Sequence, residues 1–213
     1  MTQRSASHQA QAHHGHVEGH PTRLGHCSEA KAAVSSSIRS VPPKASVNHG
    51  KPADDIYIGD WNANSQDTFA VRRGNTFYLR DTPTSGPADV VLGYGRAGDE
   101  IFVGDWNGNG QDTFAVRRGN AFYVRNSTTS GPADIVFGYG KAGDEVLVGD
   151  WNQDGIDTFA VRRGNIIFIR NDFQTGIAEQ TIGYGKAGDT LLVGDYNNDG
   201  IDTFAVRRLE PTP

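Results

Sequence analysis

The residues best suited to chemistry are aspartates and asparagines that recur in four short loops, which we call the Asp/Asn loops. The third loop reads Asp-Trp-Asn-Gln-Asp-Gly-Ile-Asp over residues 150–157, and the fourth follows the same pattern over residues 195–202. Oxygen-bearing side chains at positions 1, 3 and 5, followed by glycine at position 6, let a short loop wrap around a hard cation such as calcium. Position 12 is Val161 or Val206, where an EF-hand has glutamate, so the pattern is not that of an EF-hand. Calcium is therefore the candidate cofactor.

The candidate calcium ligands occupy positions 1, 3, 5 and 8 of each Asp/Asn loop. The first two loops carry Asn64 and Asn109 at position 5 instead of a carboxylate, and Ser65 replaces the glycine of the first loop, so we expect weaker binding there. The same side chains have a second interpretation, in which they cap tight turns by bonding to their own backbone. The full candidate set is Asp60, Asn62, Asn64, Asp67, Asp105, Asn107, Asn109, Asp112, Asp150, Asn152, Asp154, Asp157, Asp195, Asn197, Asp199 and Asp202.

These loops belong to a tandem repeat with a period of 45 residues. Gly-Asp-Trp-Asn begins at Gly59 and recurs at this interval, with Tyr196 replacing the tryptophan in the fourth copy. The first two copies match at 33 of 45 positions. A period of this length is typical of propellers and solenoids. The copies span residues 56–100, 101–145, 146–190 and, as a partial repeat, 191–208.

Each repeat is expected to form four short antiparallel strands. In the second copy, the pattern of apolar residues predicts strands over residues 101–105, 113–118, 121–126 and 133–137, and Gly119-Asn120 suits a two-residue hairpin turn. Four antiparallel strands in one such repeat correspond to one blade of a β-propeller. The predicted fold class is therefore all-β, a β-propeller of four-stranded antiparallel blades.

The two ends of the array predict how it closes. The last copy stops at Arg208, after its second strand, while residues 48–55 match the loop that leaves each blade, which we call the exit loop. Residues 34–50 are therefore expected to supply strands three and four of the last blade, which would bury both sheet edges. This predicts a monomer with four blades and a shared closing blade. Two alternatives remain open: the chain is half of a seven-bladed homodimer, or it is a fragment of a longer array.

The chain is divided into a leader, residues 1–33, and a propeller, residues 34–213. Six of the seven histidines lie between His8 and His26, and the leader has little apolar periodicity. Such a segment cannot bury enough apolar surface to offset its chain entropy, so we expect it to be disordered. It lacks the apolar core of a signal peptide, so no signal peptide is visible in this chain.

Composition argues against several classes of protein. The formal net charge is −5, whereas a nucleic-acid-binding protein depends on a basic patch. No apolar stretch reaches the ~18 residues that a membrane-spanning helix needs, so membrane insertion is not expected. Histidine is absent after His49 and the single cysteine, Cys27, lies in the leader. No catalytic constellation emerges, and we do not expect an enzyme.

Tryptophans and arginines recur with the repeat. One arginine of each Arg-Arg pair, such as Arg117-Arg118, is expected to bond to a neighbouring acidic loop, because successive residues of a strand project to opposite faces. The tryptophans adjoin the first strand of each repeat, where packing between blades is the favoured role. They are Trp61, Trp106 and Trp151.

The repeat resembles a known family. Gly-Asp-x-Asn-x-Asp-Gly followed by a strand is similar to the FG-GAP/VCBS propeller repeat of integrin α-chains and some fungal lectins. It is closer still to the Gly-Asp-Trp-Asn repeat arrays of secreted actinobacterial cell-wall amidases and other hydrolases. The resemblance covers residues 48–208 and implies a β-propeller, often calcium-bearing, in an extracellular setting. One departure is that the integrin-type loop has a carboxylate at position 9, whereas this chain has threonine there and its carboxylate at position 8.

These observations predict a non-catalytic, extracellular or cell-surface propeller that binds a glycan or protein at the cell wall or surface. Near-identical copies imply several similar sites whose weak affinities add through multivalency. Two alternatives remain: an accessory module of a cell-wall hydrolase whose catalytic domain is absent from this chain, and a purely structural scaffold. The candidate ligand-binding residues are the exit-loop tyrosines Tyr94, Tyr139 and Tyr184, which we expect to be exposed because glycines flank them.

Overall fold

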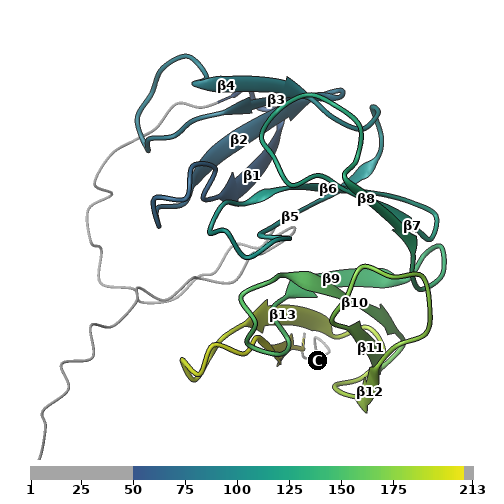
Figure 1. The fold of residues 1–213 in the computed structure, drawn as a ribbon. Helices are drawn as coiled ribbons and strands as arrows, with labels where there is room; N and C mark the ends of the chain where they lie inside the picture. The colour runs from purple at the N-terminus through teal and green to yellow at the C-terminus, as the bar shows by residue number, and fades with distance from the viewer. Residues whose placement is uncertain (1–49, 209–213) are drawn as a thin grey trace, which may run out of the picture.

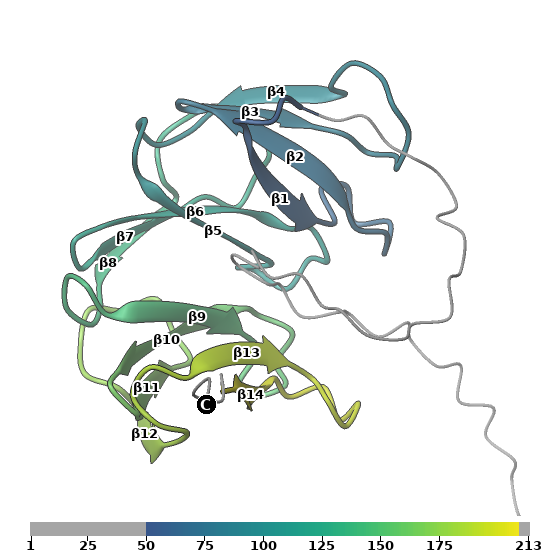
Figure 2. The same ribbon diagram turned by 180° about the vertical axis from the view of Figure 1, so that it is seen from behind.

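A computed structural model describes residues 50–208 of the chain. These residues form three four-stranded antiparallel sheets and one two-stranded sheet (Figures 1 and 2). No helix occurs in this part of the chain, and so none that could cross a membrane. The all-β, antiparallel fold class is confirmed. The strands are β1 (Asp55–Gly59), β2 (Thr68–Arg73), β3 (Thr76–Leu79), β4 (Val90–Gly93), β5 (Glu100–Gly104), β6 (Thr113–Arg118), β7 (Ala121–Val124), β8 (Ile135–Gly138), β9 (Glu145–Gly149), β10 (Thr158–Arg163), β11 (Ile166–Arg170), β12 (Gln180–Gly183), β13 (Thr190–Gly194) and β14 (Thr203–Arg207).

Every sheet has the same internal order, in which each strand pairs with the strand that follows it in the chain. The sheets are β1-β2-β3-β4, β5-β6-β7-β8, β9-β10-β11-β12 and β13-β14. The register also repeats, since Gly59 pairs with Thr68 and Gly104 pairs with Thr113. The hairpin between β2 and β3 turns at Gly74, whose φ of 65° is a conformation that glycine adopts without strain. The 45-residue sequence period is thus a structural period.

The predicted strands of the second repeat are close to the observed ones, and the largest differences are at the third and fourth strands. The third strand ends at Val124 rather than at residue 126, and the fourth begins at Ile135 rather than at residue 133. Arg125 is the reason. Its guanidinium donates hydrogen bonds to the carbonyl groups of Thr129 (2.6 Å) and Pro132 (2.5 Å), which holds the intervening chain as a loop.

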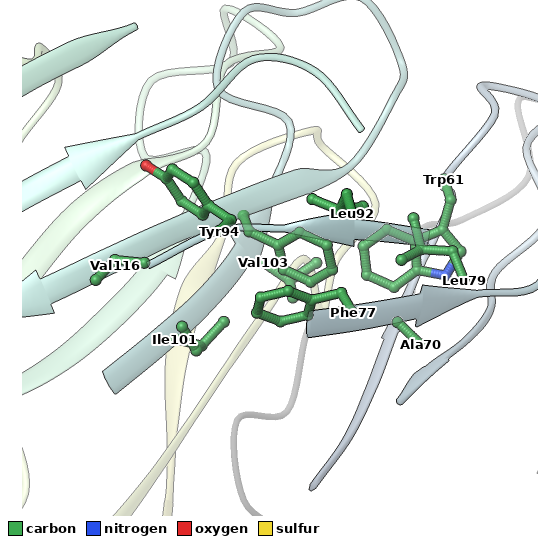
Figure 3. Packing of buried hydrophobic residues seen from close by; sticks show 10 residues of the cluster. Trp61, Ala70, Phe77, Leu79, Leu92, Tyr94, Ile101, Val103 and Val116 are labelled. Atoms are coloured by element: carbon green, nitrogen blue, oxygen red, sulfur yellow. The ribbon is translucent and has the colours of Figure 1, made fainter. Parts of the chain in front are cut away.

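The hydrophobic core lies between neighbouring sheets. The first strands are adjacent in order, β1 beside β5, β5 beside β9 and β9 beside β13, so the sheets follow one another around a curved path (Figures 1 and 2). Between the first two sheets, Phe77 and Leu92 pack with Ile101 and Val116 (Figure 3). Burying such side chains contributes about 1.5–3 kcal/mol each.

The recurring tryptophans join successive sheets, as predicted. Trp106, which follows β5, stacks on Phe159 of β10 with ring centroids 4.8 Å apart and an interplanar angle of 14°. The same stacking is repeated at the other two junctions. The equivalent pairs are Trp61 with Phe114 and Trp151 with Phe204.

Two predicted segments, the leader (residues 1–33) and the closing strands expected within residues 34–49, lie outside the described residues. The sheet β13-β14 corresponds to the first two strands of a repeat, as expected from the partial fourth copy.

Candidate functional site

The position-1 aspartate of each Asp/Asn loop organises that loop around its own carboxylate. In the third loop, Asp150 Oδ1 accepts hydrogen bonds from the backbone N–H groups at positions 3, 4 and 5, at 3.1, 2.7 and 3.3 Å. Its Oδ2 accepts a hydrogen bond from the N–H of Gly155 at 2.8 Å. Positive φ angles at Gln153 (66°) and Gly155 (79°) turn the backbone so that these groups converge. The turn-capping interpretation is confirmed for this residue.

The same arrangement affects the protonation of the fourth loop. Asp195 accepts hydrogen bonds from the backbone N–H groups of Gly200 (2.8 Å) and Asp199 (3.1 Å). These backbone hydrogen bonds, led by that from Gly200, lower the pKa of the Asp195 carboxyl. Hydrogen bonding to the charged form of a carboxylate favours that form. The loop therefore stabilises its own central charge.

The side chains at positions 3 and 5 also cap backbone groups within their loop. Asn152 Oδ1 accepts a hydrogen bond from the Asp154 N–H (3.3 Å), and Asp154 Oδ1 accepts one from the Ile156 N–H (2.9 Å). The Asn152 amide nitrogen donates to the second Asp154 oxygen at 3.0 Å. Both side chains lie at the exposed surface of the loop.

The position-8 aspartates bind the preceding repeat. Asp157 Oδ2 accepts a hydrogen bond from the backbone N–H of Asp105 (2.8 Å), and the Asp157 N–H donates to the Asp105 carbonyl (2.9 Å). Asp112 makes the same two contacts with Asp60, and Asp202 makes them with Asp150. These aspartates therefore link sheets.

The predicted calcium ligands are thus brought together only in part. Positions 1, 3 and 5 share one loop, but the position-8 carboxylates of Asp112, Asp157 and Asp202 each extend to another loop. Both oxygens of each position-1 carboxylate already accept backbone hydrogen bonds. Within residues 50–208 no three His, Cys, Asp or Glu side chains are grouped to hold a metal ion. Calcium takes about six to eight oxygens, and calcium binding by the Asp/Asn loops stays a prediction.

The exit loops are a second recurrent feature and are held by arginines from both adjoining sheets. In the loop of residues 94–99, Arg72 of β2 donates hydrogen bonds to the carbonyl groups of Arg96 and Asp99, both at 2.9 Å. Arg118 of β6 donates to the two carboxylate oxygens of Asp99, at 2.8 and 2.6 Å. The predicted contact between an Arg-Arg pair and an acidic loop is confirmed, and the other arginine of the pair binds backbone carbonyls.

These contacts also set the charge of the exit loop. The hydrogen bonds from Arg118 hold the pKa of Asp99 below its usual range, against the opposing effect of burial. The Arg118 guanidinium also lies over the Tyr123 ring, 4.8 Å from its centroid, an attractive arrangement for a cation. Arg163 and Asp144 make the same ion pair in the next exit loop, and Arg208 and Asp189 make it in the last.

Each exit loop also presents one cation at the same place in the repeat. This residue directly follows the first positive-φ glycine of the loop, and its side chain is exposed in every copy. The aspartate of the exit loop already pairs with an arginine. It therefore neutralises the exposed cation less than it neutralises that arginine. The four residues are Lys51, Arg96, Lys141 and Lys186.

A small cavity adjoins the exit loop between the first and second sheets. Its volume is about 180 Å³, and it is lined by Tyr94, Arg96, Arg118, Tyr123 and Pro132, among others. The cavity therefore combines aromatic rings with guanidinium groups at the junction of two sheets.

The tyrosines predicted to be exposed differ among themselves. Tyr94 is only 5% exposed, and its hydroxyl donates a hydrogen bond to the Tyr123 carbonyl at 2.8 Å. Tyr139 is equally buried, so the expected exposure is wrong for both residues. The following sheet covers their rings. Tyr184 is 37% exposed, and the sheet that follows it has two strands within residues 50–208. The ligand-binding role of these residues stays a prediction.

Two features of the site were missed by sequence reasoning. The first is the inter-sheet role of the position-8 aspartates. The sequence signal was that the carboxylate is at position 8 rather than 9. Because side chains of successive residues in extended chain project to opposite sides, this shift of one residue turns the carboxylate to the other side of the chain. The second is which residues accept the predicted arginine contacts. They are Asp99, Asp144 and Asp189, and their signal was that they recur at the same interval as the arginine pairs.

Comparisons of the chain with protein-family models, curated proteins and solved structures found no match. The functional argument therefore depends on the residues and geometry of this chain.

Proposed function

We propose that the described sheets are blades of a β-propeller, four in number when the last blade is completed, and that this propeller is a non-catalytic binding module. The common register of the sheets and the sequential adjacency of their first strands support this arrangement. The ligand we propose is a negatively charged glycan at an extracellular cell surface, bound by the exit loops.

The observation that carries this proposal is the exposed cation at an equivalent place in every exit loop. Arg96 lies in a loop whose backbone is fixed by Arg72 and whose aspartate is fixed by Arg118. A cation on a fixed loop loses less conformational freedom on binding than one on a mobile loop. The exposed cation recurs once in each repeat. A polymer with negative charges along its length can therefore contact several of these cations together.

In each sheet the exit loop precedes the first strand and the Asp/Asn loop follows it, so the two loops lie at opposite ends of that strand. The Asp/Asn loops are negatively charged. The Asp/Asn loops contain several aspartates and no lysine or arginine in residues 60–67, 105–112, 150–157 and 195–202. An anionic polymer would be repelled there and attracted at the exit-loop end. The small cavity beside Arg96 provides room next to that cation for part of a sugar ring.

The proposal is tested by measuring binding of the full chain to immobilised polygalacturonate, with neutral dextran as the comparison surface. Because the sites act together, Lys141→Ala should weaken apparent affinity only a few-fold, whereas replacing Arg96, Lys141 and Lys186 together by alanine should weaken it about 100-fold or more. Lys31→Ala, which removes the same charge from the leader, serves as the control. Equal binding to dextran, or full binding by the triple variant, would contradict the proposal. A lack of binding to any surface glycan would favour a structural scaffold.

A further inference from the structure

An exposed acidic residue directly follows three of the four exit-loop aspartates and begins the first strand of its sheet. Its carboxylate pairs with an arginine on the second strand of that sheet. The distances between the carboxylate oxygen and the guanidinium nitrogen are 4.0 Å for Asp55 and Arg72, 3.3 Å for Glu100 and Arg117, and 2.9 Å for Glu145 and Arg162. The last sheet differs, because the uncharged Thr190 takes this place opposite Arg207.

Each of these carboxylates also lies beside the exit loop that its arginine binds. Arg162 Nη1 donates hydrogen bonds both to Glu145 Oε2 (2.9 Å) and to the carbonyl of Asp189 (2.6 Å). Glu145 therefore flanks the last exit loop, residues 184–189, which joins β12 to β13 (Figure 2). The equivalent contacts recur one repeat earlier.

The three exit loops that join successive sheets therefore differ in the charge around them. The loops between the first and second and between the second and third sheets each have a carboxylate on both sides. The last exit loop has Glu145 on one side and Thr190 on the other. Exposed charges act on one another within the Debye length of ~8 Å at physiological ionic strength. Of the cations in these three loops, Lys186 is therefore opposed by the fewest flanking carboxylates.

The last exit loop also presents an aromatic ring. Tyr184 is 37% exposed, whereas the equivalent Tyr94 and Tyr139 are 5% and 3% exposed. Only Gly185, with a φ of 67°, separates Tyr184 from Lys186. Two residues of chain span at most ~7 Å, so a single sugar unit can contact both the ring and the ammonium group.

We propose that the last exit loop is the strongest subsite of the series and that it binds a uronate, a sugar unit that carries its own carboxylate. Lys186 pairs with the carboxylate, Tyr184 contacts the apolar face of the sugar ring, and Thr190 determines the affinity by withholding a negative charge. This inference rests on the glycan-binding function proposed above. It adds that the repeats are unequal and that charge and ring are recognised on the same sugar unit.

The charge at position 190 provides the first test. Thr190→Glu restores the carboxylate of the other repeats and should weaken binding of the full chain to immobilised polygalacturonate about two- to fivefold. The introduced carboxylate lies opposite Arg207, so the variant should fold with an unchanged or higher Tm. Gln174→Glu, which adds the same charge at an exposed place in the loop joining β11 to β12, is the matched control and should leave the affinity nearly unchanged. Glu100→Thr should strengthen binding, because it removes a carboxylate beside the other two loops.

The two proposed contacts are tested separately. Lys186→Ala should weaken binding to polygalacturonate about threefold more than Lys141→Ala does. Tyr184→Ala should weaken it about threefold or more. Binding of Tyr184→Ala to polyphosphate, which carries negative charges but no sugar ring, should equal that of the parent chain.

The outcomes distinguish this inference from the proposed function. Equal effects of Lys186→Ala and Lys141→Ala, or an unchanged affinity in Thr190→Glu, would overturn the inference while binding by the exit loops still stood. An equal loss of affinity for polyphosphate in Tyr184→Ala would show that Tyr184 supports the loop and would overturn the assignment of a uronate. Absence of polygalacturonate binding by the parent chain would instead overturn the proposed function itself.

Discussion

Asp112 and Asp60 are joined by two reciprocal hydrogen bonds across the junction of the first two sheets. The Asp60 N–H donates to Asp112 Oδ2 at 2.8 Å, and the Asp112 N–H donates to the Asp60 carbonyl at 2.8 Å. Both residues are buried. One side chain thereby satisfies the backbone of a loop that lies 52 residues earlier in the chain, and the same linkage recurs at the next two junctions.

We expect Asp112→Ala to destabilise the fold by about 1–3 kcal/mol, because a buried N–H loses its acceptor. Asp112→Asn keeps one acceptor oxygen and should cost less. Asp154→Ala, at the exposed surface of an Asp/Asn loop, should change the free energy of unfolding by less than about 0.5 kcal/mol. Urea unfolding followed by tryptophan fluorescence measures all three. Equal effects of Asp112→Ala and Asp154→Ala would contradict an inter-sheet role for Asp112.

Two equivalent tyrosines should respond differently to loss of the hydroxyl group. Tyr94→Phe removes the hydrogen bond to the Tyr123 carbonyl and should cost about 1 kcal/mol. The buried Tyr139 hydroxyl has no hydrogen-bond partner among the described residues. Tyr139→Phe should therefore leave stability unchanged or increase it, because an unsatisfied buried polar group is removed. Chemical denaturation of the two variants provides the comparison, and a larger loss for Tyr139→Phe would show that its hydroxyl is bonded in solution.

Burial of these phenols has a second consequence, which is measurable by absorbance. It raises the pKa of Tyr139 to about 12 and also raises the pKa of Tyr94. The ultraviolet titration of phenolate should therefore lose a component well above pH 10 in Tyr139→Phe, while the component of Tyr94 remains. Loss of a component near pH 10, the ordinary range of an exposed tyrosine, would instead indicate that the Tyr139 ring is accessible to water.

The strand order was predictable from sequence because it depends on local patterns that recur four times. Alternating apolar residues and glycine turns specify β6 and its hairpin with little help from the rest of the chain. The role of Asp157 was less accessible, since its partner Asp105 lies in another repeat and the contact exists only when two sheets pack. The burial of Tyr94 was missed for the same reason: its loop is flanked by glycines, but the ring is covered by the following sheet.

Removal of divalent cations should leave the fold unchanged. The Asp150 carboxylate accepts four backbone hydrogen bonds, and Asp157 binds the preceding loop, so the Asp/Asn loop is held without a metal ion. We expect the same Tm with and without EDTA, and a lower Tm in EDTA would contradict this expectation. Calcium binding is tested separately by calorimetric titration: a saturable heat, with a stabilising shift that disappears in Asp199→Asn, would identify the fourth loop as a calcium site.

Acid should destabilise the fold through the exit-loop ion pairs. Hydrogen bonds from Arg208 lower the pKa of Asp189 to about 2, and those from Arg118 lower the pKa of Asp99. An unfolded aspartate has a pKa of about 3.9. Since the folded-state pKa is the lower one, these pairs stabilise the fold fully above about pH 4, and the contribution is lost as the pH falls toward about 2.

The variant Asp189→Asn isolates one of these pairs. It should lower Tm at neutral pH, where the charged pair is intact in the parent chain, and have a smaller effect near pH 2, where Asp189 becomes protonated. The dependence of Tm on pH between about 4 and 2 should accordingly be shallower in the variant than in the parent. Asp154→Asn, which removes one exposed carboxylate outside the exit loops, controls for the change in net charge. Parallel Tm curves for Asp189→Asn and the parent chain would show that the Arg208 pair does not contribute to the acid sensitivity.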